Sequence, residues 1–190
     1  MFMIHRPSQT VIDGFIVEQR SHKFSYPHVG ATRGTLPGGY TVDHNRVRLG
    51  HGDQVFRQAV ASLRLWQMFK LGWVELFQPG TQIDAGATVA VLVHHFGFWS
   101  LNACRIVYVI DEERRFGFAY GTLQDHAEEG EERFSLQWVA EDDSVVYDIL
   151  AFSKPRMWPA RLARPLSRVL QKRFARDSMA AMQRAIHDAP

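Results

Sequence analysis

The middle of this chain is a succession of short strand-like segments with little room between them. Four consecutive segments are rich in Val, Ile, Phe, Tyr and Trp, and they are Thr88–Phe96, Leu101–Ile110, Arg115–Thr122 and Glu131–Ala140. Further strands are expected at Tyr40–Leu49, Trp73–Phe77 and Ser144–Ser153. Connections this short fit hairpins, because a parallel crossover needs about a dozen residues or more. The pattern therefore predicts an antiparallel meander of roughly seven strands.

Helical periodicity marks three further segments. A short helix is expected to end near Arg20, with Thr10 and Asp13 spaced as a capping box. A second helix is expected between Asp53 and Trp66, where apolar residues recur with the helical period. After the last strand, a long amphipathic helix is predicted over Pro165–Ile186, with one apolar face formed by Leu166, Leu170, Phe174, Ala181 and Ala185.

The composition fits one globular domain over residues 1–190. At 190 residues and 46% hydrophobic content, the chain can bury a core without metal or disulfides. We expect an N-terminal helix and ordered loop at 1–39, a sheet with an inserted helix at 40–153, and the C-terminal helix at 159–187. The single cysteine, Cys104, excludes an internal disulfide and suits a reducing compartment. With no apolar run of bilayer length and no secretory signal pattern, a cytoplasmic location is expected.

Several motifs resemble those of an uncharacterised domain family of bacteria and plants. They are Phe24–Arg33, Leu36–Tyr40, Leu71–Trp73, Leu101–Arg105, Phe116–Thr122, Gly130–Phe134 and Arg173–Ser178. The order of elements is also similar to the helix-grip fold of the START-like superfamily, which is also called birch-pollen-allergen-like or polyketide-cyclase-like. That resemblance implies an α+β fold, with a curved antiparallel sheet around the C-terminal helix and a cavity for an apolar small molecule. The uncharacterised family lends no activity.

Charged residues interrupt two apolar faces. By strand alternation Arg105 shares a face with Leu101, and on the last helix Asp177 projects beside apolar positions. A buried charge needs a partner, and the candidates for Arg105 are Glu75, Glu132 and Asp177. One interpretation is a structural ion pair between helix and sheet. The other is a polar pocket floor in which the arginine binds a carboxylate or phosphate.

One of two adjacent glutamates, Glu131 or Glu132, must point into the fold if their strand has one buried face. In the preceding strand, Tyr120 lies among aromatic residues, whereas the opposite face carries only Gly117, Ala119 and Gly121. A bare strand face leaves space for another part of the chain or for a ligand.

The segment from Ser21 to Gly39 is rich in Gly, Pro and Thr, which predicts an ordered loop without regular structure. Long loops of this kind are often functional. Two interpretations stay open for it. Tyr26, Thr32 and Arg33 lie across the mouth of a pocket, or the loop is a packing strap over the sheet.

Metal and cofactor motifs are missing from the sequence. His94 and His95 are adjacent on a strand and point to opposite faces, and no zinc-binding spacing occurs. There is no dinucleotide fingerprint and no phosphate-binding loop, so no cofactor and no metal are expected. Cys104 lies in mid-strand, where a buried and inert thiol is the usual outcome.

Three classes of function follow. The first is binding of a small hydrophobic or amphipathic ligand, with contacts expected from Tyr26, Arg105, Tyr108, Tyr120, Glu132 and Asp177. The second is a cyclase- or hydrolase-like enzyme, with Glu132 or Glu75 as acid/base and Arg105 stabilising negative charge. The third is a scaffold or membrane-surface protein that uses the basic helix residues Arg164, Arg168, Lys172 and Arg176. Nucleic acid is not an expected partner, because the net charge is only +2. The oligomeric state is left open.

Overall fold

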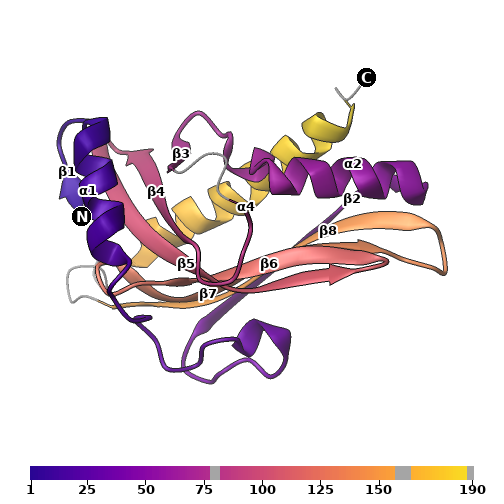
Figure 1. Cartoon of the computed structure of the whole chain (residues 1–190), viewed down its shortest axis with the longest axis horizontal. Coiled ribbons are helices and arrows are strands. Elements are labelled where there is room, and N and C mark those ends of the chain that lie inside the picture. Colours follow the sequence, from indigo (N-terminus) through magenta and orange to yellow (C-terminus); the bar gives the residue numbers. More distant parts are fainter. Residues whose placement is uncertain (78–81, 157–163, 188–190) are drawn as a thin grey trace.

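The chain folds as a curved antiparallel sheet that wraps a long C-terminal helix, the helix-grip architecture (Figure 1). The computed structural model describes residues 1–77, 82–156 and 164–187. The strands are β1 (Phe2–Met3), β2 (Thr41–His51), β3 (Val74–Phe77), β4 (Thr88–His95), β5 (Phe98–Glu112), β6 (Arg115–Thr122), β7 (Glu128–Trp138) and β8 (Ser144–Pro155). The helices are α1 (Gln9–Gln19), α2 (Gly52–Arg64) and α4 (Arg164–His187), with short 3-10 turns η1 (Ala31–Arg33) and η2 (Gln67–Phe69). The predicted C-terminal helix included residues 159–163, which lie outside the described residues.

The strands are paired in the order β2-β8-β7-β6-β5-β4-β3, and every pairing is antiparallel. The predicted antiparallel meander is therefore confirmed. Strand β2 lies at one edge of the sheet, beside β8. The two-residue strand β1 pairs with β5 and was not predicted, because two residues carry no periodicity. Helices α2 and α4 lie on one side of the sheet, which we call the inner face, and η1 lies on the other, the outer face (Figure 1).

A bulge in β5 decides which side chains face inward. Ile106 is opposite Tyr120 and Tyr108 is opposite Ala119, so Val107 is an extra residue in the strand. A bulge bends the strand and shifts its alternation by one position. As a result Tyr108 lies on the outer face together with Arg105, three residues earlier, and Val109 packs into the inner core. The simple alternation predicted across this strand is wrong beyond Ile106.

One half of the inner face is filled by large side chains. Phe118 and Phe134 are fully buried on neighbouring strands, and their rings are 5.4 Å apart. Trp66, which follows α2, packs edge-on against Phe118 at 4.9 Å. Leu63 of α2 and Met182 of α4 are fully buried in the same cluster. This half is a packed core that fixes the C-terminal part of α4 against the sheet.

Helix α1 covers the outer face at the other end of the sheet. Its Ile12, Phe15 and Ile16 are buried in a second cluster with Leu92 and Leu101. The helix is capped by Ser8, whose Oγ accepts a hydrogen bond from the backbone amide of Val11 at 3.4 Å. The predicted capping box of Thr10 and Asp13 is therefore wrong, because the helix begins one residue earlier than Thr10.

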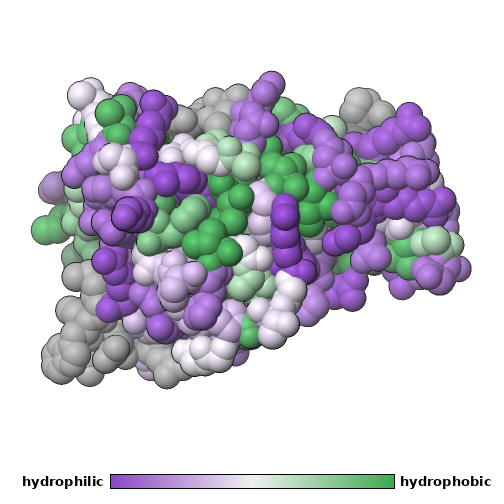
Figure 2. All heavy atoms as spheres, turned by 60° about the horizontal axis from the view of Figure 1, so that its bottom comes forward, coloured by the Kyte–Doolittle hydropathy of each residue, from purple (hydrophilic) through white to green (hydrophobic). Residues whose placement is uncertain are grey.

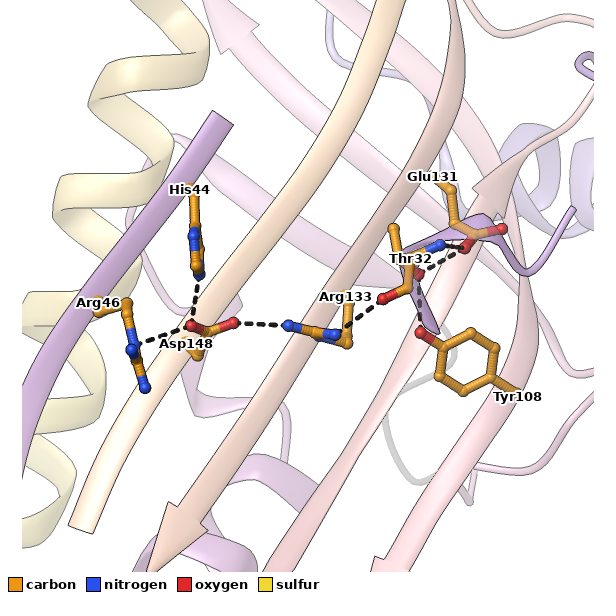
Figure 3. Close-up of polar contacts among 7 residues, drawn as sticks. All are labelled: Thr32, His44, Arg46, Tyr108, Glu131, Arg133 and Asp148. Atoms are coloured by element: carbon orange, nitrogen blue, oxygen red, sulfur yellow. Dashed lines mark hydrogen bonds and ion pairs between the residues drawn. The ribbon is translucent and has the colours of Figure 1, made fainter. Parts of the chain in front are cut away.

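The loop between α1 and β2 is fastened to the outer face by a buried carboxylate. Glu131 of β7 is 3% exposed and accepts hydrogen bonds from Tyr26 Oη at 2.7 Å, Gly30 N at 2.6 Å and Thr32 N at 3.0 Å. The Thr32 hydroxyl also bonds to Glu131 and to Tyr108 Oη (Figure 3). Gly30 has a φ of 88°, a left-handed conformation that glycine adopts without strain. Of the two interpretations of this loop, the packing strap is the one the structure supports.

A second outer-face carboxylate continues this network toward β2. Arg133 donates to the carbonyl oxygen of Thr32 at 2.7 Å and to Asp148 at 3.0 Å. Asp148 also binds His44 Nε2 at 2.6 Å and Arg46 Nε at 3.0 Å (Figure 3). The polar contacts therefore tie the loop to strands β7, β8 and β2.

The bare strand face of β6 makes room for this loop. A Cβ atom on Gly121 would lie 2.1 Å from Tyr26 Oη, so no side chain fits there. Gly117 is closed in the same way by backbone of β7, with Phe134 O at 2.3 Å. The space is thus filled by a tyrosine of the strap and by the neighbouring strand rather than by a helix. Elsewhere on this side of the molecule hydrophilic side chains dominate the surface, with apolar atoms showing near its middle (Figure 2).

None of the described helices combines the length and the apolar composition that crossing a membrane requires.

Replacing Glu131 by alanine is expected to destabilise the protein by about 3 kcal/mol or more, because it leaves the buried donors of Tyr26, Gly30 and Thr32 unpaired. The free energy of unfolding in urea measures this change. Glu113→Ala, in an exposed turn, is the matched control and should change it by about 0.5 kcal/mol at most. Equal effects of the two substitutions would contradict the strap.

Candidate functional site

A cavity of about 580 Å³ lies between the sheet and the N-terminal half of α4. The cavity exists because the inner face carries small residues beneath this half of α4, whereas it carries aromatic residues beneath the other half of the helix. The floor is lined by Ser100, Asn102, Cys104, Thr122, Gly130, Ala151 and Ser153. Apart from Ser153, which Gln171 of α4 contacts, these side chains make no hydrogen bond to α4 in the described structure, and their small size leaves space beneath the helix. A volume of this size is typical of small-molecule sites.

The walls of the cavity are mostly apolar and partly aromatic. Helix α4 contributes Leu166, Leu170 and Phe174, and the other side is formed by Phe69, Trp73, Val74, Val91 and Ile149. Trp73 is held in place by Asp177 of α4, which accepts a hydrogen bond from the indole Nε1 at 3.0 Å. The guanidinium of Arg173 lies 4.3 Å from the centre of the Trp73 ring. The aromatic wall is thus fixed by contacts outside the cavity.

A carboxyl and a phenol form the polar feature of the floor. Glu132 of β7 lies directly opposite Tyr120 of β6, and Tyr120 Oη donates to Glu132 Oε2 at 2.8 Å. Among the described residues, no other group bonds to the Glu132 carboxyl. Burial raises the pKa of Glu132 to about 7, against a smaller lowering by the Tyr120 hydrogen bond. A group with this pKa gains or loses its proton near neutral pH.

Beside the cavity, polar contacts join α4 to three strands. Arg168 forms a bidentate ion pair with Asp43 of β2, with Nη2 at 2.6 Å from Oδ1. Gln171, one turn further, donates to Glu128 of β7 and to Ser153 of β8. Burial raises the pKa of Glu128, although its hydrogen bonds and Arg168 act against that rise. These contacts hold the N-terminal half of α4 over the small-residue floor.

Two of the predicted site residues, Tyr120 and Glu132, line the cavity. Arg105 does not, and its predicted role in the pocket is wrong. Its Nη2 donates to the carbonyl oxygens of Gln19 at 3.0 Å and Arg20 at 2.9 Å, the last residues of α1. Arg105 thus caps a helix C-terminus on the outer face, where a cation is favourable. None of its three predicted carboxylate partners contacts it in the described structure.

Three other predicted residues also lie on the outer face. Glu75 forms a largely exposed ion pair with Arg6, with the atoms 2.6 Å apart. Tyr26 and Tyr108 belong to the strap network and are absent from the cavity lining. The structure therefore places neither tyrosine where it was predicted, Tyr26 across the pocket mouth and Tyr108 among the ligand contacts. Arg33, the third residue predicted at the mouth with Thr32, lies over the Tyr108 ring at 4.0 Å.

Asp177 does not line the cavity, and it affects the cavity wall through its hydrogen bond with Trp73. Burial raises the pKa of its carboxyl, but hydrogen bonds from Arg176 and Trp73 outweigh that effect and the pKa is lowered. The predicted pairing of Asp177 with Arg105 is replaced by this pairing with Trp73. Asp177 is therefore a positioning residue for the aromatic wall.

Several cavity residues were missed by sequence reasoning. Glu128 sits in an acidic segment that resembles a solvated turn, and Arg168 sits on a helix face that resembles a solvated basic surface. In the structure, Glu128 lines the cavity and accepts a hydrogen bond from Gln171, and Arg168 pairs with Asp43 beside it. Arg176 is likewise paired with Asp177, at 2.9 Å. Among the missed cavity residues, only Trp73 could have been found from the sequence, because it is an aromatic residue at the start of a predicted strand.

Cys104 is buried in the floor, so the prediction of a buried cysteine is confirmed, and burial raises the pKa of its thiol. Within the described ranges, one group of potential metal ligands lies together: Glu18, His22 and Asp125, with ligand atoms within 4.8 Å of one another. It lies outside the cavity lining, Glu18 and Asp125 are exposed, and Asp125 is bonded to Gln19. We assign no metal to it.

Sequence relatives cover the whole cavity. Residues 25–181 match the family described as a domain of unknown function (DUF1990). A UPF0548 protein of Dictyostelium discoideum is 35% identical and covers 98% of this chain and 96% of its own length. A UPF0548 protein of Deinococcus radiodurans is also 35% identical, with 97% and 98% covered.

Solved structures support the same fold at low sequence identity. A hypothetical protein of Helicobacter pylori is 13% identical with a TM-score of 0.51, and covers 85% of this chain and 96% of that one. The Zhui aromatase/cyclase of a Streptomyces species is 12% identical with a TM-score of 0.50, and covers 78% of this chain and 94% of that one. At these identities the likeness concerns the fold alone.

The raised pKa of Glu132 gives a prediction for stability. The folded protein holds this proton up to a pH of about 7, whereas the unfolded chain loses it near the ordinary value of 4.5. The carboxyl therefore favours folding at low pH, and this contribution is lost as the pH rises from about 4.5 to about 7. Glu132→Gln, which keeps an acceptor for Tyr120, removes the dependence. Relative to the wild type, the variant should gain roughly 3 kcal/mol of unfolding free energy between pH 4.5 and pH 8.

Urea denaturation at a series of pH values measures this difference, with Glu113→Gln as the control at an exposed position. Parallel pH profiles for the wild type and Glu132→Gln would show that the carboxyl has an ordinary pKa.

Proposed function

Because this chain belongs to the DUF1990 family, whose description assigns no activity, we propose from its own cavity that it binds a small amphipathic molecule. The observation that carries this proposal is a cavity of about 580 Å³ with apolar and aromatic walls and one polar pair, Glu132 and Tyr120, in its floor. Sites for small ligands typically combine a large apolar surface with a few polar groups that set orientation.

The ligand would lie along the floor between β7 and α4. Its apolar part would contact Trp73 and Phe174, and its polar end would meet Glu132. Ala151 is central to this arrangement, because it lies opposite Glu132 on β8 and its methyl group leaves the space beside the carboxyl open.

A second candidate function is general acid/base catalysis by Glu132. The specific observation in its favour is a carboxyl with a pKa of about 7 that faces a cavity. Such a group exchanges protons efficiently at neutral pH. Arg105 and Glu75 take no part in this version, because both lie on the outer face.

Filling the cavity is expected to abolish binding. In Ala151→Leu three added carbon atoms occupy the floor beside Glu132, and 1-naphthylmethanol should bind about tenfold or more weakly than to the wild type. Isothermal titration calorimetry measures the affinity. Ala140→Leu makes the same change at an exposed site outside the cavity and should leave the affinity unchanged. Absence of binding to the wild type, or equal binding to Ala151→Leu, would refute the proposed ligand site.

Catalysis by Glu132 is expected to speed the exchange of acidic C–H protons. The carboxylate removes a methyl proton of 2-acetylnaphthalene to give the enolate, which takes a deuteron back from D₂O. Proton NMR should show loss of the methyl signal with the wild type at pD near 7.5 and no loss above buffer with Glu132→Gln. If the two proteins exchange the methyl group equally, the enzymatic alternative is ruled out while ligand binding stands.

A further inference from the structure

We propose that the cavity selects ligands with an ammonium head group, which binds the free oxygen of Glu132 between aromatic side chains. This inference rests on the proposed function and specifies its ligand class. It reverses the expectation from the sequence, in which an arginine in the floor would have bound a carboxylate or phosphate.

The first step concerns the partners of Glu132. Tyr120 donates to Oε2, and no described residue donates to Oε1, which belongs to a side chain that lines the cavity. Among the described side chains, no lysine or arginine forms an ion pair with Glu132. When the carboxyl is ionised, its charge is therefore not neutralised by the protein. A ligand cation supplies the missing partner, and a pair of this kind excludes water from both charges.

The second step concerns the other charges around the cavity. Glu128 lies four residues from Glu132 on the same strand and also lines the cavity, and its hydrogen-bond donors are neutral side chains such as Gln171. The cation of Arg168 is neutralised by Asp43. Lys172 is exposed at the rim. The interior therefore has negative character, which repels a carboxylate or phosphate head and attracts an ammonium.

The third step concerns the walls. Trp73, Phe69, Tyr120 and Phe174 line the cavity, and the faces of such rings attract cations. Aromatic rings also accept the apolar part of the ligand at no cost in hydrogen bonds. The combination of an unpaired carboxylate with several aromatic rings is typical of sites for organic cations.

The charge of the site depends on pH through several groups. Facing Glu132 are Tyr120 from β6, Cys104 from β5, Tyr147 from β8 and Asp43 from β2, together with Glu128 from its own strand. Burial raises the pKa of each of the two tyrosines and of the thiol, so these groups stay neutral below pH 9. Glu132, with a pKa of about 7, and Glu128, whose pKa burial also raises, are thus the groups whose ionisation changes the head-group preference as the pH approaches neutrality.

The test compares three probes with one ring system: 1-naphthylmethylamine, 1-naphthylmethanol and 1-naphthoate. Calorimetry at pH 8, where most of the Glu132 carboxyl is ionised, should show the amine bound about tenfold or more tightly than the alcohol, and the carboxylate weakest. Glu132→Gln should remove the preference for the amine and leave the alcohol affinity within about threefold. Glu113→Gln is the matched control and should keep the wild-type order.

The outcomes separate the inference from the function on which it rests. If the alcohol binds but the carboxylate binds as tightly as the amine, or if Glu132→Gln keeps the amine preference, the ammonium inference is overturned and ligand binding stands. If none of the three probes binds at millimolar concentration, both are overturned. The same series at pH 5.5 gives an independent check, because protonation of Glu132 should shrink the amine preference.

Discussion

The packing of α4 against the aromatic half of the inner face is the contact on which the rest of the structure depends. Phe118, Phe134 and Tyr147 fill the space under the C-terminal half of the helix, where Met182 is fully buried. Because a helix is stiff, this contact also sets the height of its N-terminal half above the sheet. Beneath that half the floor carries small residues such as Ala151, and the difference in side-chain size becomes a cavity. One half of the inner face thus packs in the core, and the other half forms the floor of the cavity.

Two adjacent glutamates have the same side chain but different roles, because their surroundings differ. Glu131 points outward to a strap that supplies donors from Tyr26, Gly30 and Thr32, so its carboxylate is fully engaged in holding the loop. Glu132 points inward, receives one hydrogen bond from Tyr120, and has a pKa raised to about 7. A buried carboxyl with a single donor keeps its proton to a higher pH, because one hydrogen bond does not offset the cost of burying the charge. The second is therefore the one available to a ligand.

Most of the fold was predictable from the sequence, because strand alternation and the long helical period are local signals. The side of the sheet on which Arg105 lies could not be predicted in this way, because it depends on a contact with a distant part of the chain. Arg105 was expected in the pocket, but α1 covers that side of β5 and offers its C-terminal carbonyls to the arginine. No local pattern reveals which face of a strand a distant helix covers. Glu128 was missed for a similar reason, since its acidic neighbours suggested a solvated turn and its partner Gln171 is 43 residues away. Glu132 was predictable because alternation required one glutamate of its pair to face inward.

The two halves of α4 are held to the sheet by contacts of different strength. At the C-terminal end, Ser178 and Met182 are fully buried, and moving them would open the main core. At the N-terminal end the helix is held by polar contacts, and the side chains of Arg168 and Asp43 keep about a quarter of their exposure to solvent. Ion pairs with access to water contribute roughly 1 kcal/mol or less. Separating the N-terminal half of α4 from the sheet therefore costs much less than opening the core, and a ligand that forms its own ion pair at Glu132 gains most where the protein has left a charge without a partner.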